Sequence, residues 1–316
     1  MKLFVKLFCF LFCVISYGQS GQIITNKPIA DSLKTWQFKN KAGIDLSEVT
    51  FVNWNAGGSN SISALSSLLS TLVYKKERLT WVNRGVFRLG GNKQESQRIR
   101  KTDDALELTS NIGYQKDSLS NWYYSGRFNL KTQLLHGFSY PDRENPISKF
   151  FAPGYIFLGI GAEYGKRIEE WSVYVSPLTY KGTMVLDREL ANSGAFGVEP
   201  AVYDVDGNLI KKGKRNRSEL GLYFIATYQA NLFENINIRS QTELYSDYVN
   251  SFGNIDVNWE ILFDFKVNDF VRAALGSHII YDDDVDAFEE INGKQINKGP
   301  KVQWKQILGV GVTMDF

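Results

Sequence analysis

The stretch Val302–Phe316, "VQWKQILGVGVTMDF", decides the fold. Its apolar side chains stand at every second position, and mostly small or polar residues lie between them: the apolar set is Val302, Trp304, Leu308, Val310, Val312, Met314 and Phe316. A period of two residues predicts a β-strand with one apolar face and one polar face. The medium that the apolar face meets, either a protein core or lipid, therefore determines the class of fold.

Four other stretches repeat this alternation over about a dozen residues each: 122–134, 236–248, 255–267 and 271–281. Strands of soluble proteins are usually about five or six residues long. A tilted strand that crosses a membrane needs roughly 9–11 residues. The strand length therefore favours a transmembrane barrel over a soluble β-sandwich.

Scanned in this way, the whole chain yields about twelve strands. They are predicted at 38–52, 60–75, 78–91, 104–116, 121–136, 154–168, 170–180, 217–232, 235–249, 253–267, 271–283 and 302–316. An all-β, antiparallel transmembrane barrel follows, because no open sheet edge is stable in hydrocarbon.

The connections between these strands predict two unlike rims. Short turns such as "KKE", "EE" and "ND" alternate with longer connections at 92–103, 137–153, 181–216 and 284–301. The connections after the first and ninth strands are intermediate or short and fit this rule less well. Short periplasmic turns and long extracellular loops are typical of outer-membrane barrels.

The N-terminal segment "MKLFVKLFCFLFCVISYGQS" has the pattern of a cleaved signal peptide. Lys2 and Lys6 precede a short apolar run, and small residues follow at 16–18. We therefore expect a signal peptide at 1–18, a short periplasmic lead-in at 19–37 and the barrel at 38–316. The two cysteines, Cys9 and Cys13, both lie in the signal segment, so the mature chain would have no disulfide.

The overall composition suits an outer-membrane protein. A net charge of +2 gives no reason to expect nucleic acid as a partner, and no cofactor is predicted. The expected partners are outer-membrane lipid, lipopolysaccharide and the assembly machinery of the outer membrane. The terminal aromatic residue, Phe316, resembles the signal that this machinery reads.

Several pieces of the chain resemble an uncharacterised family of outer-membrane barrels, domain-of-unknown-function family 3078. They are Phe51–Ser63, Arg100–Tyr114, Asn129–Phe138, Phe150–Tyr155, Ser176–Lys181, Ile279–Asp284 and the terminal strand. The most specific piece contains Trp54, Asn55, Gly57 and Gly58. The resemblance implies a location and a fold, and it adds no chemistry.

The polar face of the predicted strands carries many charges, which we expect to line the lumen. The lining set is Arg84, Arg88, Arg127, Lys131, Arg239, Glu243, Asp256, Glu260, Asp264 and Arg272. In an open channel, opposed charged walls would select solutes through a transverse field. In a plugged barrel, the same charges would pair across the lumen, and a count of twelve strands leaves both arrangements open.

Three functions follow from this sequence. The first is a small passive, porin-like channel for polar solutes. The second is a non-conducting structural or accessory barrel that binds a partner or lipopolysaccharide through its outer loops. The third, an outer-leaflet lipid hydrolase, would need His136 and Ser139 to act together, but no third group that would orient the histidine is evident. We therefore predict no enzyme and no catalytic residue.

Two charged runs in the loops give weaker hypotheses. Asp282, Asp284 and Asp286 alternate as carboxylate ligands of calcium can, although a solvated loop explains them equally simply. The basic run Lys211–Arg217 could contact lipopolysaccharide phosphates. Just before it, Asp206 and Gly207 predict the turn of a small hairpin.

Overall fold

The computed structural model describes residues 35–50, 60–95, 97–117, 120–168, 170–249, 252–291 and 294–315. Side chains are described for these residues except at 49, 286–291, 294–297 and 315. Chain contacts separate 1–34 from a second unit, Thr35–Phe316, which holds all the strands. Among the described residues, no helix is long and apolar enough to cross a membrane.

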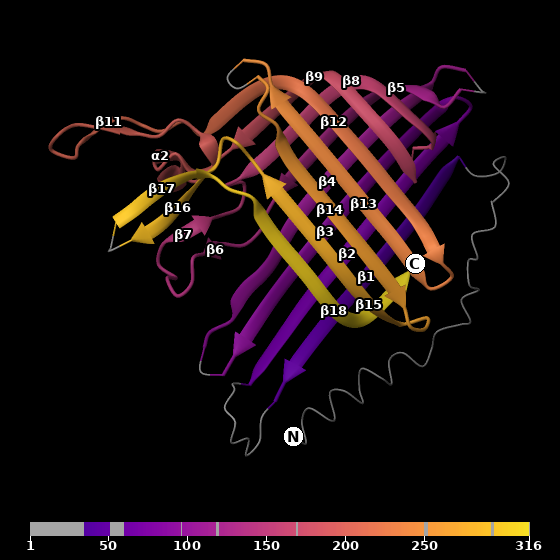
Figure 1. Cartoon of the computed structure of the whole chain (residues 1–316), viewed down its shortest axis with the longest axis horizontal. Coiled ribbons are helices and arrows are strands. Elements are labelled where there is room, and N and C mark those ends of the chain that lie inside the picture. Colours follow the sequence, from indigo (N-terminus) through magenta and orange to yellow (C-terminus); the bar gives the residue numbers. More distant parts are fainter. Residues whose placement is uncertain are drawn as a thin grey trace. The chain divides into compact units, whose positions relative to one another are not determined.

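Twelve strands close into one antiparallel barrel (Figure 1). They are β1 (Trp36–Val49), β2 (Ser61–Lys76), β3 (Leu79–Gln94), β4 (Arg100–Gln115), β5 (Trp122–Thr132), β8 (Gly154–Arg167), β9 (Trp171–Met184), β12 (Asn216–Phe233), β13 (Ile236–Asp247), β14 (Asp256–Lys266), β15 (Val271–Tyr281) and β18 (Gln303–Asp315). Neighbours in sequence pair with one another, and β18 pairs with β1 to close the ring. The predicted fold class and the count of twelve are confirmed.

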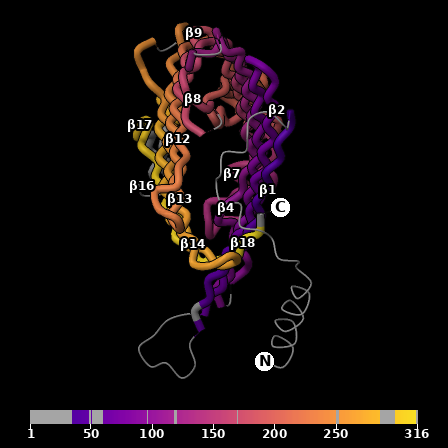
Figure 2. Tube along the Cα trace, turned by 90° about the vertical axis from the view of Figure 1, so that its right-hand side faces the viewer, coloured from indigo at the N-terminus to yellow at the C-terminus, as the bar shows by residue number. Residues whose placement is uncertain are grey.

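Figure 2 shows two walls of this barrel, with β8, β12, β13 and β14 in one and β1, β2 and β4 in the other. The outer face is apolar: Leu308 is 78 % exposed, Trp304 66 % and Ile160 65 %. Buried positions include many polar side chains, such as Glu163, Asn129 and Thr179. A soluble barrel has the opposite arrangement, so this outer surface matches lipid.

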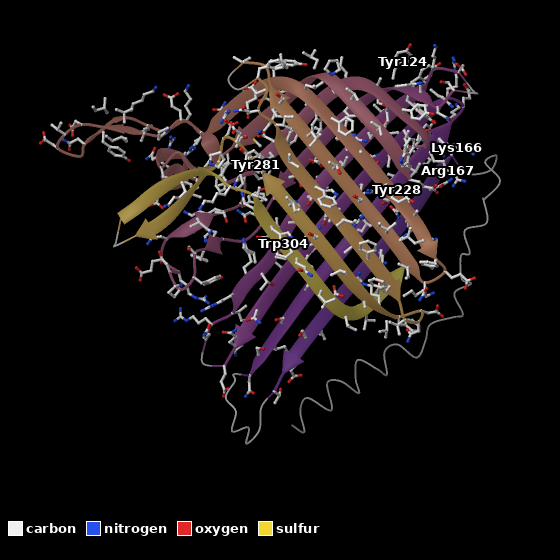
Figure 3. All side chains as sticks on the ribbon, in the orientation of Figure 1. Tyr124, Lys166, Arg167, Tyr228, Tyr281 and Trp304 are labelled. Carbon is white, nitrogen blue, oxygen red and sulfur yellow. The ribbon has the colours of Figure 1, made fainter. Side chains whose placement is uncertain are left out.

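Tryptophan and tyrosine rings cluster on the outer face at the short-turn rim. Trp36 lies 4.7 Å from Tyr74 and 6.1 Å from Trp81, measured between ring centroids. A second group joins Trp122, Tyr164 and Trp171. Figure 3 labels further outer-face aromatics, among them Tyr124, Tyr228 and Trp304. Rings with an apolar body and a polar edge suit the membrane interface.

The two rims differ as the sequence predicts. One carries the short connections 77–78, 116–121, 168–170, 234–235 and 267–270. The other carries 50–60, 95–99, 133–153, 185–215, 248–255 and 282–302. The intermediate connections 50–60 and 248–255 therefore both belong to the long-loop rim.

One predicted loop is wrong. The segment 92–103 is mostly strand, because β3 runs to Gln94 and β4 starts at Arg100, leaving a connection of five residues. Gly90 and Gly91 resemble a turn in the sequence, but they take up a shift of register between β3 and β4. A glycine pair allows such a bulge without ending the strand.

The long connections carry small elements of their own. Connection 133–153 contains β6 (Gly137–Phe138) and β7 (Pro146–Ser148), and 282–302 contains β16 (Asp286–Ile291) and β17 (Lys294–Pro300). Connection 185–215 contains α2 (Arg188–Asn192), η2 (Ala195–Gly197), β10 (Val202–Tyr203) and β11 (Leu209–Lys211). The hairpin expected at Asp206–Gly207 is confirmed as β10–β11, with φ of 83° at Gly207.

A small apolar core holds connections 133–153 and 185–215 together. It consists of buried Ala152, Val185, Ala191 and Val198, with Leu190 and Phe196 packed against them. Asp187 caps α2 by accepting hydrogen bonds from the backbone N–H groups of Glu189 and Leu190, each 3.1 Å long. Lys149 also donates to Asp187, at 2.6 Å, and so ties the two connections together.

Candidate functional site in the lumen

The structure places all ten predicted lumen charges on the inner face of the barrel. They come from β3, β5, β13, β14 and β15, and most contact a strand that is not their neighbour. Such contacts are possible only through the interior. The alternation along each strand produces this placement, because a side chain next to an outward apolar residue must point inward.

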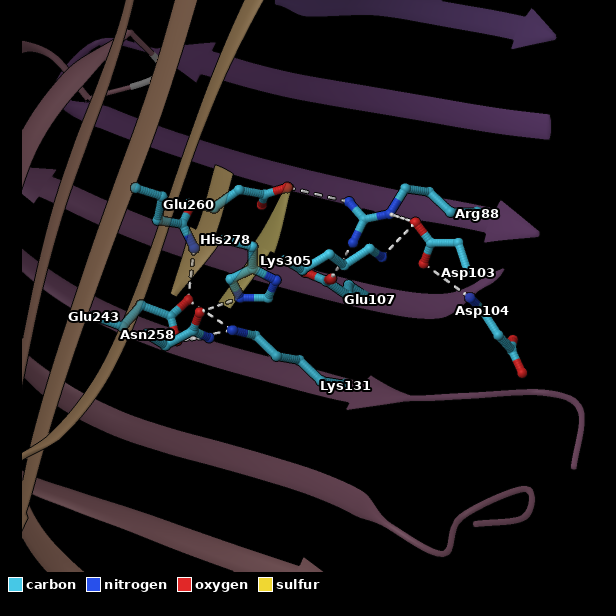
Figure 4. A network of polar contacts seen from close by, with 11 residues as sticks. Arg88, Asp103, Asp104, Glu107, Lys131, Glu243, Asn258, Glu260, His278 and Lys305 are labelled. Atoms are coloured by element: carbon cyan, nitrogen blue, oxygen red, sulfur yellow. Dashed lines mark hydrogen bonds and ion pairs between the residues drawn. The ribbon is translucent and has the colours of Figure 1, made fainter. Parts of the chain in front are cut away.

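Arg88 is the centre of one ion-pair network (Figure 4). Its guanidinium lies 3.5 Å from Asp103 and 3.6 Å from Glu107 on β4, and 3.4 Å from Glu260 on β14. Lys305 of β18 reaches the same Asp103 at 2.8 Å. In the ring of twelve, β3 and β14 are five strands apart, so this network joins nearly opposite walls.

Lys131 and Glu243 form a second contact across the lumen, between β5 and β13. The Lys131 ammonium lies 2.8 Å from both carboxylate oxygens, and Gln241 donates to the same carboxylate at 2.6 Å. Figure 4 shows Asn258 beside this pair, and Asn258 in turn bonds His278 at 2.7 Å. The side chain of Glu243 is only 5 % exposed, so its charge depends on these partners.

A third group lies nearer the long-loop rim. Lys181 of β9 bonds Asp256 of β14 at 2.7 Å, and Arg217 of β12 bonds Asp284 at 2.6 Å. Glu219 lies between these two cations, at 3.6 and 3.3 Å. The sequence analysis missed Lys181 because its predicted strand ended at 180, whereas β9 continues to Met184.

The remaining predicted lumen charges on β14 and β15 pair with β1. Arg272 lies 3.2 Å from Asp45 and 3.7 Å from Asp264, and Lys41 bonds Asp264 as well. Neither Asp45 nor Lys41 was among the predicted lumen residues. Both alternate with outward apolar residues of β1, including Ile44 and Leu46, so their parity could have identified them.

Glu163 is a further inward charge that the sequence analysis missed. Its side chain is fully buried and accepts hydrogen bonds from Asn111 at 2.9 Å and Ser125 at 2.8 Å. Arg127 approaches the same carboxylate at 3.3 Å and stacks over Tyr174 at 4.9 Å. Strand parity was the available signal, because Glu163 precedes the outward Tyr164 on β8.

Two cavities lie on either side of the central ion pairs. One, of about 60 Å³, lies toward the short-turn rim and is lined by Arg84, Arg127 and Arg239 together with polar side chains. The other, of about 220 Å³, lies toward the long-loop rim and is lined by Lys101, Asp103, Asp104, Gln133 and Lys305. Both have polar linings, so both can hold water and small polar solutes.

The acidic run contributes to a cluster different from the predicted one. Carboxylate oxygens of Asp282 and Asp284 lie within 4.8 Å of each other and of Asp256, while the side chain of Asp286 is outside the described residues. Lys181 and Arg217 already pair with Asp256 and Asp284. Two bound ammonium and guanidinium groups compete directly with a cation, so this donor set does not fit calcium well.

His136 does not lie where the lipid-hydrolase hypothesis requires. The hypothesis put it on a strand with its side chain toward lipid, but β5 ends at Thr132 and His136 is an exposed residue of connection 133–153. Its ring contacts Phe138 edge-on at 6.3 Å. Among the described residues, no hydrogen bond links His136 to Ser139, so a nucleophile–base pair is not formed there.

The remaining predicted positions lie outside the described residues. They are Trp54, Asn55, Gly57 and Gly58 of the family motif, and Phe316.

Residues 46–138 match the model of a family described as "Protein of unknown function (DUF3078)". The match confirms the resemblance over this range, which includes Phe51–Ser63, Arg100–Tyr114 and Asn129–Phe138. The pieces after residue 138 lie beyond it. No curated protein matches the chain.

Similar solved structures include the COG4313 outer membrane channel from Pseudomonas putida F1. It is 12 % identical, with a TM-score of 0.40 over 92 % of this chain and 100 % of that chain. The NanC porin is 9 % identical, with a TM-score of 0.35 over 87 % and 98 % of the two chains. The translocator domain of the autotransporter NalP from Neisseria meningitidis is 12 % identical, with a TM-score of 0.33 over 90 % of each chain. The chain is thus a closed β-barrel that resembles outer-membrane channels and porins.

Proposed function

We propose that this protein is an outer-membrane channel that passes small polar solutes by passive diffusion, and that its central ion pairs are the narrowest part of the passage. The short-turn rim faces the periplasm and the long-loop rim faces the outside, as is general for such barrels. Lipid contacts the apolar outer face, and the assembly machinery inserts the chain.

One observation carries this proposal. Ion pairs between opposite walls, Arg88–Glu260 and Lys131–Glu243, separate two polar cavities that lie toward opposite rims. A passage for polar solutes needs polar walls along its length and a charged constriction that sets selectivity.

Conductance of the purified, refolded protein in a planar bilayer tests the proposal. The wild type should show steady single-channel conductance. The double variant Lys131→Ala with Glu243→Ala removes both members of the central pair, and its conductance should rise at least twofold. As a matched control, Lys211→Ala with Glu199→Ala removes an ion pair from the exposed part of connection 185–215 and should leave conductance unchanged.

A barrel without conductance in either form, although folded and heat-modifiable, would overturn the channel. A second candidate function would then stand: a non-conducting accessory barrel that binds lipopolysaccharide or a protein partner through its loops. The exposed hairpin β10–β11 favours it, because Val205 and Ile210 are unburied beside Lys211 and Lys212. Loss of lipopolysaccharide binding on deletion of 202–211 would support that function.

A further inference from the structure

Three arginines from opposite walls line the cavity near the short-turn rim. Arg84 is on β3, Arg127 on β5 and Arg239 on β13. In the ring of twelve, β3 and β13 are six strands apart and therefore directly opposite. A solute that moves along the barrel axis must pass between Arg84 and Arg239. We call this space, bounded by Arg84, Arg127 and Arg239, the arginine chamber.

The positive charge of the arginine chamber is poorly neutralised. Neither Arg84 nor Arg239 forms an ion pair with any side chain that the structure describes, and Arg127 and Arg239 both repel Arg84. Arg127 has Glu163 at 3.3 Å, but that carboxylate also accepts from Asn111 and Ser125. Arg88, four residues from Arg84 on the same face of β3, has three carboxylates within 4 Å. The contrast places excess positive charge in the chamber alone.

Unused hydrogen-bond donors point the same way. The Nε atoms of Arg84 and Arg127 are buried and have no partner among the described residues. Gln241 and Thr109 add polar groups to the lining. Glu170 is the one carboxylate among the lining residues, and it pairs with Arg167 at 2.8 Å. Tyr174, fully buried, holds the Arg127 guanidinium by cation–π contact.

A planar guanidinium presents paired N–H groups that match the geometry of a carboxylate or phosphate. Like charges held together in a partly dehydrated space favour an anion between them. We propose that the arginine chamber binds a small oxyanion, a carboxylate or phosphate group, and gives the passage a preference for anionic solutes. The transport part of this inference rests on the proposed channel, and the binding part does not.

Isothermal titration of the folded protein in detergent tests binding without conductance, with inorganic phosphate and acetate as separate probes. The wild type should bind at least one of them. Arg84→Gln and Arg239→Gln should each weaken that binding at least tenfold. The matched control, Arg78→Gln, removes the same charge from the same rim, but Arg78 bonds the Lys116 carbonyl and is exposed. Its binding should equal that of the wild type.

The two probes separate the possible sources of the oxyanion. Binding of phosphate alone identifies phosphorylated solutes, and binding of acetate alone identifies carboxylic acids. Arg84→Lys and Arg239→Lys keep the charge and serve where a glutamine variant fails to fold; loss of the paired N–H groups should still weaken binding several-fold. Absence of binding by the wild type, or equal binding by all variants, overturns the site.

Reversal potentials in a salt gradient test the selectivity. The wild type should prefer chloride to potassium, and Arg84→Gln with Arg239→Gln should reduce that preference at least threefold. A protein that binds the probe without conducting would retain the site and refute the channel. A protein that conducts without binding or anion preference would retain the channel and refute the site.

Discussion

At the scale of single residues, the buried ion pairs of the lumen are the costly feature. A carboxylate in a low-dielectric interior loses its hydration, and only close partners offset that loss. Glu243 is 5 % exposed and depends on Lys131, Gln241 and Asn258 for its hydrogen bonds. Such a pair stabilises one arrangement of opposite walls more than it stabilises the fold as a whole.

Removal of one partner of this pair should therefore be far worse than removal of both. Lys131→Met leaves the Glu243 carboxylate buried without its cation and should lower the free energy of unfolding by about 3–5 kcal/mol. Lys131→Met with Glu243→Met should recover most of that loss. Urea unfolding in detergent micelles measures both, and equal stabilities of the single and double variants would contradict the argument.

Asp187 predicts a pH-dependent change in the loops at the long-loop rim. Partial burial raises the pKa of Asp187, but hydrogen bonds from Lys149 and the Leu190 N–H outweigh it and hold the pKa below its usual value. Because the folded state has the lower pKa, this contribution is complete above about pH 4 and is lost as the pH falls through the folded value.

Limited proteolysis of connection 185–215 by pepsin should therefore accelerate in the wild type as the pH is lowered below about 4. Asp187→Asn keeps a capping side chain without the charge and should remove this pH dependence. Glu199 does not confuse the comparison, because hydrogen bonds from Lys211 and Lys214 lower its pKa to about 2. The same acid midpoint in Asp187→Asn would exclude Asp187 as the cause.

At the scale of elements, the barrel depends on the seam between β1 and β18. These strands pair from Lys41–Asp315 to Asp45–Gly311. A Cβ at Gly311 would lie 2.1 Å from Asp45 Oδ1 and 2.5 Å from the Ile44 carbonyl oxygen. Only glycine therefore lets β1 approach β18 at this point, and the approach also brings Asp45 to Arg272.

Gly311→Val should loosen the seam and destabilise the barrel by at least about 1–3 kcal/mol, the usual cost of overpacking. Gly309→Val is the matched control on the same face of β18, since its nearest neighbour would be Asp45 Cβ at an ordinary 3.6 Å. The temperature at which the folded electrophoretic band is lost measures both variants. Equal temperatures would show that the seam tolerates a side chain at Gly311.

At the scale of the whole molecule, the apolar outer face should be sensitive to charge according to depth. Leu308 is 78 % exposed and lies in the interior of β18, whereas Val302 is 64 % exposed and lies just before the strand at the rim. Leu308→Arg should cost about 2–4 kcal/mol, and Val302→Arg at most about 1 kcal/mol. Equilibrium unfolding from lipid vesicles measures both, and equal costs would contradict a membrane-buried outer face.

The sequence by itself determined the number of strands and the face on which each charge lies. Both depend on alternation along a single strand, which is local: Arg84 and Arg88 of β3 must share a face whatever surrounds them. It also indicated the two unlike rims. Its errors lie at strand ends, as at 92–103 and Lys181, where pairing with a neighbour extends the strand beyond its pattern.

Only the tertiary structure decided which charges meet. Whether Arg88 faces Glu260, or Arg84 faces Arg239, depends on closure of the ring and on the register of every strand between them. No local pattern encodes that register, because each strand contributes its own shift. Neutralised charges at the centre and unneutralised arginines nearer the short-turn rim are therefore properties of the closed barrel.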